Sequence, residues 1–331
     1  MNQLTDSHNR TIDYLRISIT DHCNLRCQYC VPLDDRTKLS MTEILSYEEL
    51  FAVARNAVEV GVTKIRITGG EPLMRKNMLQ FCRMLNSLPQ ITDLSVTTNG
   101  ILLESMAADL KAAGVKRVNV SLDTQDRGRY TDITGKDALD RVLRGIQTAA
   151  DVGLTPIKIN MVPMRGINDD EIVSMARWTL DTPYDIRFIE LMPTSGWARQ
   201  RHDKLFMGID DVRRQVETIG ALEEIPHLRT RGPAAYVRLA GAQGRIGFIA
   251  AVSHHFCKTC NRLRLTADGK LRACLFAEDE IDVRGPLRSG ASPEELQQII
   301  RAAVAAKPKG HTLNEDCTKS VNGRIMQAIG G

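Results

Sequence analysis

Strand-like and helix-like segments alternate along residues 12–191, and this alternation leaves few architectures open. The helix-like segments begin near Ser46, Arg75, Leu102, Asp137 and Asp169, and Ser46 followed by Glu49 is a helix start signal. The strand-like segments are 12–19, 63–68, 92–97, 115–122, 155–162 and 185–191. Such alternation is typical of βα units on a parallel sheet. We therefore expect an α/β fold, an incomplete (β/α)6 barrel of the TIM type.

Polar side chains recur at every second position of the expected strands. Arg16 precedes Ile17 in the first strand, and Lys64 and Arg66 flank Ile65 in the second. Side chains alternate between the two faces of a strand, and strands covered on both faces by helices are nearly continuous hydrophobic runs. Because an unpaired buried cation is costly, the polar stripes predict a barrel interior that holds an anionic ligand. The alternative is that these residues are solvated edge positions.

The pattern changes after Met192 and Pro193. A basic, turn-containing stretch (195–204) leads to a helix-like segment (209–219). Two hairpin-like pairs follow, 236–239 with 247–251 and 263–266 with 270–273, and a helix is expected after Ser292 and Pro293. We expect two domains, a barrel at residues 1–193 and a smaller C-terminal domain at residues 194–331.

Composition excludes several classes of protein. With 331 residues, 43% hydrophobic and 25% charged, the chain is typical of globular proteins, and its net charge of +4 is too small to indicate nucleic-acid binding. Residues 1–10 lack the apolar stretch of a signal peptide, and no apolar run approaches the ~20 residues of a membrane span. We expect a cytoplasmic protein, in which clustered cysteines indicate metal binding or catalysis.

The first cysteine triplet follows the first expected strand. Cys23, Cys27 and Cys30 have the spacing C-x3-C-x2-C, with Tyr29 before the last cysteine. An iron–sulfur cube normally takes four thiolates, so three predict a cluster with one iron open to a small ligand. The alternatives are a zinc site completed by His22 and a disulfide framework.

The triplet and the turn at residues 69–72 (Gly-Gly-Glu-Pro) resemble the radical S-adenosylmethionine (radical SAM) enzymes. The resemblance implies that the open iron chelates the amino and carboxylate groups of S-adenosylmethionine. One electron then cleaves the sulfonium and leaves a 5′-deoxyadenosyl radical. By the same resemblance the residues that contact S-adenosylmethionine are Tyr29, Gly70, Glu71, Ser121 and Met192.

A second cysteine triplet lies in the C-terminal part. Cys257, Cys260 and Cys274 have the spacing C-x2-C-x13-C. C-x2-C is common in zinc sites, and His254, His255, His311 or Cys317 could supply a fourth ligand. The triplet at the other end of the chain favours a second iron–sulfur cluster instead. Cys82 and Cys317 stand alone and are expected to be buried or bystander thiols.

With the second triplet the resemblance narrows to one family, molybdenum cofactor biosynthesis protein A, the GTP 3′,8-cyclases. It covers nearly the whole chain, including residues 97–100 (Thr-Thr-Asn-Gly) and the closing Gly330 and Gly331. It implies a second [4Fe–4S] cluster whose open iron binds guanine, and a double-glycine tail that reaches into the active site. The implied GTP contacts are Arg16, Arg66, Thr97, Lys158, Arg262, Leu263 and Arg264, to which strand position adds Lys64 and Arg187.

The resemblance also implies a reaction and partners. The deoxyadenosyl radical abstracts the ribose 3′ hydrogen of GTP, and the carbon radical adds to C8 of guanine. The product is 3′,8-cyclo-7,8-dihydroguanosine 5′-triphosphate. The implied partners are a one-electron donor such as a flavodoxin or ferredoxin, a downstream cyclic pyranopterin monophosphate synthase and a second copy in a homodimer, with neither nucleic acid nor membrane.

Two alternatives remain open from the sequence. One is another radical SAM enzyme with an auxiliary cluster, such as a peptide-modifying maturase, which would not need so many inward cations. The other is a nucleic-acid-binding zinc protein that uses the second triplet. Aromatic residues interleaved with basic ones would support the zinc protein, but aromatics are 5% of the chain and the cations follow the strand alternation.

Overall fold

The computed structural model describes residues 3–30, 38–225, 232–277, 279–311 and 326–329. These residues form a 12-stranded sheet with the order β12-β11-β10-β1-β2-β3-β4-β5-β6-β9-β8-β7. Its six central strands are parallel and neighbour one another in chain order. They are β1 (Tyr14–Ser18), β2 (Lys64–Thr68), β3 (Asp93–Thr98), β4 (Arg117–Ser121), β5 (Lys158–Met161) and β6 (Asp185–Ile189). The six expected strands are therefore confirmed.

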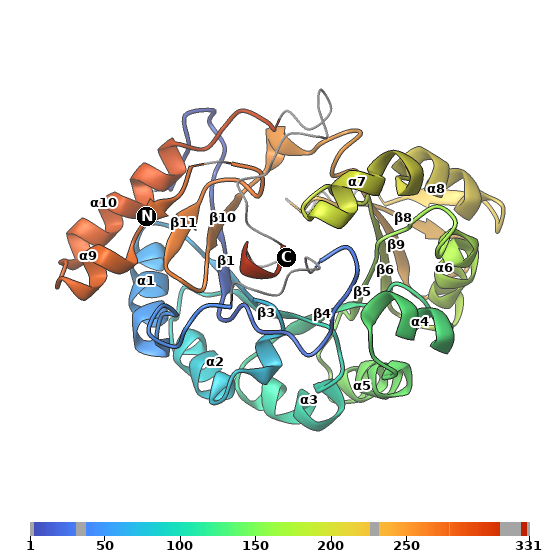
Figure 1. Ribbon diagram of the computed structural model, residues 1–331, viewed down its shortest axis with the longest axis horizontal. Coiled ribbons are helices and arrows are strands. Elements are labelled where there is room, and N and C mark those ends of the chain that lie inside the picture. The colour runs from blue at the N-terminus through green and yellow to red at the C-terminus, as the bar shows by residue number, and fades with distance from the viewer. Residues whose placement is uncertain (1–2, 31–37, 226–231, 278, 312–325, 330–331) are drawn as a thin grey trace.

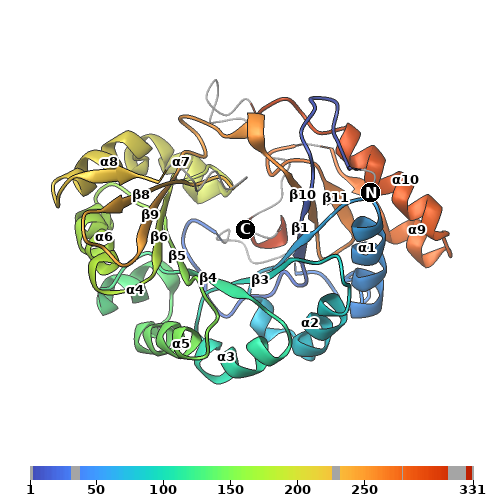
Figure 2. The ribbon, with the colours of Figure 1, turned by 180° about the vertical axis from the view of Figure 1, so that it is seen from behind.

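Helices cover the outer face of this sheet, and the strands curve around a central space (Figures 1 and 2). The helices between the central strands are α1 (Tyr47–Glu59), α2 (Met78–Asn86), α3 (Leu103–Ala112), α4 (Arg127–Thr134), α5 (Leu139–Asp151) and α6 (Ile172–Asp181), with short 3-10 turns at Pro72–Met74 and Asp169–Glu171. Ser46 caps α1 through a capping box with Glu49. The apolar stripes, represented by Leu15, Ile17 and Ile65, are fully buried in the core, so the α/β barrel-like fold is confirmed.

The C-terminal part extends the sheet at both edges. On one side β10 (Arg262–Leu265) pairs in parallel with β1, followed by antiparallel β11 (Lys270–Arg272) and β12 (Ile281–Asp282). On the other side β9 (Arg245–Ile249) pairs in parallel with β6, followed by antiparallel β8 (Ala235–Leu239) and β7 (Leu222–Glu224). Both expected hairpins are present. One sheet thus runs through residues on both sides of the expected boundary at 193/194.

The C-terminal part also contributes helices. They are α7 (Gly196–Leu205), α8 (Ile209–Glu217), α9 (Arg284–Arg288), α10 (Pro293–Ala305) and α11 (Met326–Ile329), with a 3-10 turn at Cys257–Thr259. Helix α10 follows Ser292 as expected. The expectation of a turn-containing stretch at 195–204 is wrong, because Ser195 accepts a hydrogen bond from the Ala198 backbone and starts α7. Helix α4 was also not expected. Asp126 caps its start, and Gly135, with a φ of 72°, ends it.

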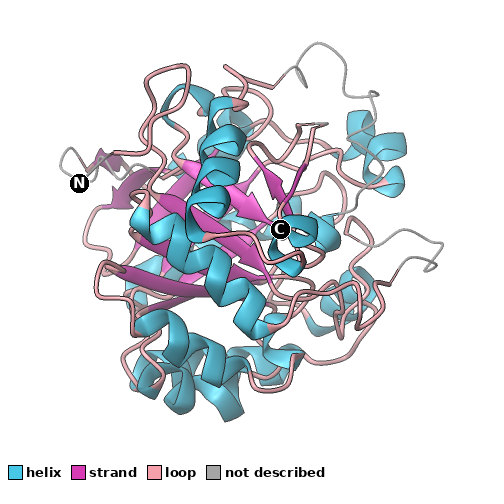
Figure 3. Cartoon of the chain, turned by 90° about the vertical axis from the view of Figure 1, so that its left-hand side faces the viewer, coloured by secondary structure: helices cyan, strands magenta, loops and turns pink. Residues whose placement is uncertain are grey.

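The interior of the curved sheet is not empty. Helix α11 lies near the centre in two opposite views (Figures 1 and 2), and its Ile329 is buried. In the side view the helices form the outer layer and the strands lie within (Figure 3). Among the described helices, none combines the length and apolarity needed to cross a membrane.

Candidate active site

A cavity of about 780 Å³ lies on the inner side of the sheet. It brings together most of the residues that the sequence singled out. Those that line it are Cys23, Cys27, Cys30, Cys257, Cys260, Cys274, Tyr29, Gly70, Ser121, Met192, Arg16, Lys64, Arg66, Thr97, Lys158, Arg187, Arg262 and Arg264. Glu71 and Leu263 do not line it, and Gly330 and Gly331 lie outside the described residues.

A row of arginines crosses three neighbouring strands. Arg16 of β1 is in register with Arg264 of β10 on one side and with Arg66 of β2 on the other. Residues in register share a face of the sheet, so three guanidinium groups face the cavity together. Burial lowers the pKa of Arg66 to about 10, and burial together with Arg262 lowers that of Arg264 to about 9. Within the described part of the chain the buried Arg66 Nε has no hydrogen-bond partner. Such a row fits a polyanion.

More cations line the cavity from other strands. Lys158 of β5 lies 3.3 Å from the Tyr236 hydroxyl and 3.9 Å from Asp185. Burial, with repulsion from Arg187, lowers the pKa of Lys158 to about 7. Arg187 of β6 donates to the Asn119 side chain at 2.9 Å. An added negative charge would therefore favour the protonated form of Lys158.

Two of the expected substrate contacts, Lys64 and Leu263, have side chains that are already paired or buried in the core. Lys64 lines the cavity but already pairs with Asp13 at 3.1 Å. Leu263 does not line the cavity, and its side chain is 1% exposed in the hydrophobic core. The reason is strand alternation, since Arg262 and Arg264 on either side occupy the cavity face. By contrast the buried Thr97 hydroxyl faces the cavity and finds no partner among the described residues.

The first triplet is held by the turn at residues 69–72. The Gly70 backbone donates to Thr20 O and the Glu71 backbone to His22 O, both at 2.7 Å. A Cβ on Gly70 would lie 2.3 Å from His22 O. Glycine is required there because the turn packs directly against the loop that leads into Cys23.

Glu71 lies behind the turn rather than on the cavity surface. Its carboxylate is 0% exposed and accepts hydrogen bonds from Leu73 N, the Thr98 hydroxyl and Asn99 N. Burial raises its pKa to about 7. Glu71 therefore ties the end of β3 to the turn. Asn99 in turn places its side-chain amide 3.7 Å from Cys23 Sγ.

Asp123 is a site residue that the sequence reasoning missed. It lines the cavity, and its carboxylate accepts from the Tyr29 hydroxyl at 2.6 Å and from Val162 N at 2.8 Å. Burial raises its pKa to about 6. The signal was available, because Asp123 follows Ser121 by two residues and so continues the polar stripe of β4.

The second triplet flanks β10 and β11. Cys257 and Cys260 precede β10, Cys260 N donates to Cys257 O at 3.2 Å, and Cys274 follows β11. Burial alone would raise the pKa of Cys260, but the charges of Arg262 and Lys307 and hydrogen bonds from Arg262 lower it to about 6. This thiol is thereby poised to be a thiolate, the form that binds iron. Lys307 also lines the cavity, and no sequence pattern indicated it.

The suggested zinc ligands lie in several different settings. No three His, Cys, Asp or Glu side chains in the described ranges are grouped to hold a single metal ion. Of the suggested fourth ligands, His255 and His311 contact each other with ring centroids 4.7 Å apart and ring planes tilted by 57°. Another, His254, pairs with Asp210 at 3.2 Å, and Cys317 lies outside the described residues.

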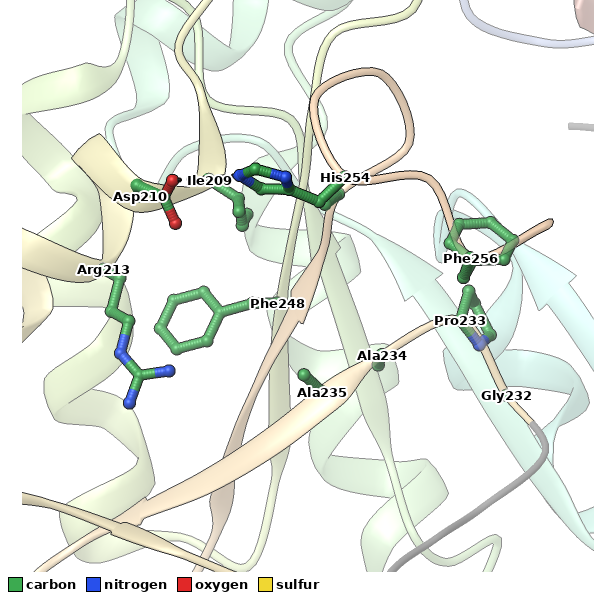
Figure 4. Close-up of a pocket in the computed structure, with 11 residues that line it drawn as sticks. Ile209, Asp210, Arg213, Gly232, Pro233, Ala234, Ala235, Phe248, His254 and Phe256 are labelled. Carbon is green, nitrogen blue, oxygen red and sulfur yellow. Dashed lines mark hydrogen bonds and ion pairs between the residues drawn. The ribbon is translucent and has the colours of Figure 1, made fainter. Parts of the chain in front are cut away.

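A smaller pocket of about 390 Å³ adjoins the cavity (Figure 4). Gly232, Pro233, Ala234 and Phe256 line both spaces. Its guanidinium, Arg213, already pairs with Glu217 and Glu224. The pocket contains neither cysteines nor uncompensated cations among its lining residues, so the larger cavity is the candidate active site.

Comparison with known proteins decides the family. Residues 17–179 match the model of the Radical SAM superfamily, and residues 184–313 match that of Molybdenum Cofactor Synthesis C. A GTP 3′,8-cyclase of Thermodesulfovibrio yellowstonii is 48% identical over 99% of this chain and 100% of its own length. The chain belongs to the GTP 3′,8-cyclase family. A second member, from Moorella thermoacetica, is 46% identical with the same coverage of both chains.

Solved structures agree on the fold. Streptococcus suis SuiB bound to S-adenosylmethionine superposes with a TM-score of 0.63 at 16% identity, over 95% of this chain and 77% of SuiB. The structure of anSMEcpe with bound AdoMet gives 0.52 at 16% identity, over 90% and 81% of the two chains. As a member of its family the chain is a radical SAM enzyme of molybdenum cofactor synthesis, and it uses two [4Fe–4S] clusters and S-adenosylmethionine.

Proposed function

We propose that this chain converts GTP into 3′,8-cyclo-7,8-dihydroguanosine 5′-triphosphate, the reaction named for its relatives. One observation carries the proposal. A single cavity of about 780 Å³ is lined by both cysteine triplets and by the row Arg264, Arg16 and Arg66. Two clusters and one polyanionic substrate could then meet in one enclosed space.

The two triplets are the proposed cluster ligands. Cys23, Cys27 and Cys30 would hold the first cluster, and Cys257, Cys260 and Cys274 the second, each leaving one iron for a further ligand. When bound, the first cluster and S-adenosylmethionine supply the radical that removes a hydrogen atom from the substrate. The protein has to bind, orient and enclose the reactants.

S-adenosylmethionine is proposed to lie beside the first triplet. Tyr29, Gly70, Ser121 and Met192 line the cavity there and supply its contacts. Glu71 acts indirectly in this proposal, because its carboxylate is already satisfied by internal donors. It keeps the turn rigid, so that the backbone of Gly70 can face the cofactor.

The triphosphate is proposed to lie against the arginine row. Arg forks bind phosphate oxygens with two parallel hydrogen bonds. Arg16, Arg66 and Arg264 line the same cavity and would bind such a ligand together. The other proposed triphosphate contacts line the same cavity and are Lys158, Arg187, Thr97 and Arg262. Lys64 would also contribute if it contacts the triphosphate as well as Asp13.

The guanine base is proposed to bind at the second triplet, and the C-terminal tail to approach it. Met326 of α11 lines the cavity and Ile329 is buried. These contacts support a role for Gly330 and Gly331, the next residues of the chain, inside the active site. We also propose that residues 1–193 form the radical SAM partial barrel and that residues 194–331 carry the second cluster and contribute to GTP binding.

The test is to follow one hydrogen atom. The protein is incubated with reductant, S-adenosylmethionine and GTP deuterated at the ribose 3′ position. Mass spectrometry should then find deuterium in 5′-deoxyadenosine, and it should also detect a cyclised nucleotide. GTP deuterated at the ribose 2′ position is the control and should leave 5′-deoxyadenosine unlabelled. If S-adenosylmethionine is cleaved but the 5′-deoxyadenosine takes up no deuterium from GTP, the result would favour the maturase alternative and contradict the proposal.

The proposed partners follow from the chemistry. The reaction needs a one-electron donor at low potential, for which a flavodoxin or ferredoxin is suited. The product needs a consumer, the proposed cyclic pyranopterin monophosphate synthase. We also propose a cytoplasmic location and a homodimer. Pull-down with the reduced donor would test the donor interaction, and sedimentation of the purified chain would test the homodimer.

A further inference from the structure

Buried cations contact the backbone around the second triplet at three places. Arg10 donates through Nη1 to Cys257 O at 2.7 Å. Lys307 donates through Nζ to Arg262 O at 2.7 Å and also to Ala273 O. Arg262 follows Cys260 by two residues, and Ala273 immediately precedes Cys274. Each of the three cysteines therefore lies at or beside a carbonyl that accepts from a cation.

Arg10 links distant segments of the chain at this point. Its guanidinium pairs with Asp6 at 2.6 Å and donates to Pro308 O at 2.7 Å and Lys309 O at 3.2 Å. Both members of the ion pair are buried. The N-terminal segment lies beside α10 in both opposite views (Figures 1 and 2). Arg10 thus fixes the backbone of Cys257 against the residues that follow α10.

Lys307 is the more unusual of the two. It is 4% exposed, and both of its hydrogen bonds in the described part of the chain go to carbonyl oxygens. In that part of the chain no carboxylate forms an ion pair with it. Burying an ammonium group without a counter-charge is costly. Cys260 and Cys274, which would each carry negative charge as cluster ligands, are the groups that interact favourably with it. A cube on three thiolates carries net negative charge, and more of it when reduced.

We propose that Lys307 is a positioning residue that sets the charge balance of the second cluster, while Arg10 fixes the loop that carries Cys257. This inference rests on the proposed function for the assignment of the triplet to a cluster. The ammonium group favours the reduced form, because net charge and hydrogen bonding around a cluster set its potential. Loss of the ammonium group therefore shifts the midpoint potential of this cluster to more negative values.

The test uses the full-length chain with the first triplet replaced (Cys23→Ala, Cys27→Ala, Cys30→Ala), so that only the second cluster contributes. Iron content and the midpoint potential by EPR-monitored titration are measured with and without Lys307→Gln and Lys307→Met. Lys307→Arg is the charge-retaining variant. Lys309→Met, at an exposed position two residues away, is the matched control.

The two neutral variants should show a more negative midpoint potential or lose cluster iron, whereas Lys307→Arg and Lys309→Met keep about four irons and a potential near that of the parent. Lys307→Gln with full iron and the parental potential would overturn the inference. A parent without iron would overturn it together with the cluster assignment. Failure of the unsubstituted chain to convert GTP, together with an intact, Lys307-sensitive second cluster in the test variants, would count against the proposed function alone.

Discussion

The two cysteine triplets line one cavity in opposite electrostatic surroundings. Burial and Glu71 raise the pKa of Cys23, and burial, Cys30 and Asp123 raise that of Cys27 well above its usual value. Burial also raises the pKa of Cys257, but the charges of Arg262 and Lys307 outweigh burial at Cys260 and lower its pKa to about 6. Carboxylates thus act on Cys23 and Cys27 of the first triplet, and cations act on Cys260 of the second.

This difference matches the two kinds of chemistry. A cluster next to carboxylates takes up an electron less readily, which favours the low potential needed to cleave a sulfonium. A cluster next to cations is stabilised when it carries more negative charge and can serve as a Lewis-acid site for a base. In the proposed function, the two tasks would therefore be separated by the charges placed around otherwise similar thiols.

Removing one cysteine from each triplet gives the largest expected effect. Cys27→Ala and Cys257→Ala should each lower the iron content from about eight to about four per chain. Cyclised product should fall to background in both variants. Cleavage of S-adenosylmethionine should disappear only in Cys27→Ala, because only the first cluster binds this cofactor. Equal cleavage by the two variants would remove the functional distinction between the triplets.

The second prediction tests whether the arginine row binds the triphosphate of GTP. Arg264→Ala should weaken GTP binding by about 10- to 100-fold, because a charged hydrogen-bond pair contributes about 1.5–3 kcal/mol. Calorimetry on the reconstituted protein measures this. Arg214→Ala is the control, since the Arg214 side chain is 73% exposed and lies outside the cavity lining. Unchanged affinity in Arg264→Ala would place the triphosphate elsewhere.

Lys158 predicts a pH dependence of GTP binding. Its pKa of about 7 in the free protein rises when the triphosphate binds. Below that pH the lysine is already charged and affinity is full, whereas above it binding must take up a proton. Affinity should therefore fall by up to about tenfold per pH unit above about pH 7. Lys158→Arg should remove this slope, and an unchanged slope in that variant would assign the titration to another group.

Asp123 gives the smallest effect and concerns the first triplet. Asp123→Asn leaves either the Tyr29 hydroxyl or Val162 N without an acceptor, at a cost of about 1 kcal/mol. The affinity for S-adenosylmethionine should fall about fivefold with GTP affinity unchanged. The exposed Asp132→Asn serves as the control. A matching loss of GTP affinity would mean that Asp123 supports the whole cavity rather than the first triplet.

Much of this arrangement could be predicted from local patterns. The alternation of strand-like and helix-like segments predicted the six central strands. Polar residues at every second strand position predicted that Arg16 and Arg66 face inward, and cysteine spacing identified both triplets. Strand alternation also explains why Leu263 faces the core. Patterns of this kind work because the period of a strand fixes which face a side chain occupies.

The remaining features depend on contacts between distant segments. Lys307 reaches Arg262 across 45 residues, and Arg10 reaches Cys257 across 247. The role of Glu71 depends on Thr98 and Asn99, which belong to another strand end. No local spacing encodes such partners. Helix α7 was missed for a different reason, because the Ser195 cap is a local signal that the basic, turn-like composition of the stretch hid.

The most direct test compares the midpoint potentials of the two clusters, each alone in the full-length chain and without substrate. One variant replaces Cys23, Cys27 and Cys30 by alanine, and the other replaces Cys257, Cys260 and Cys274. The cluster on the first triplet should have the more negative potential, because carboxylates act on Cys23 and Cys27, whereas cations act on Cys260. Equal potentials, or the reverse order, would contradict the account.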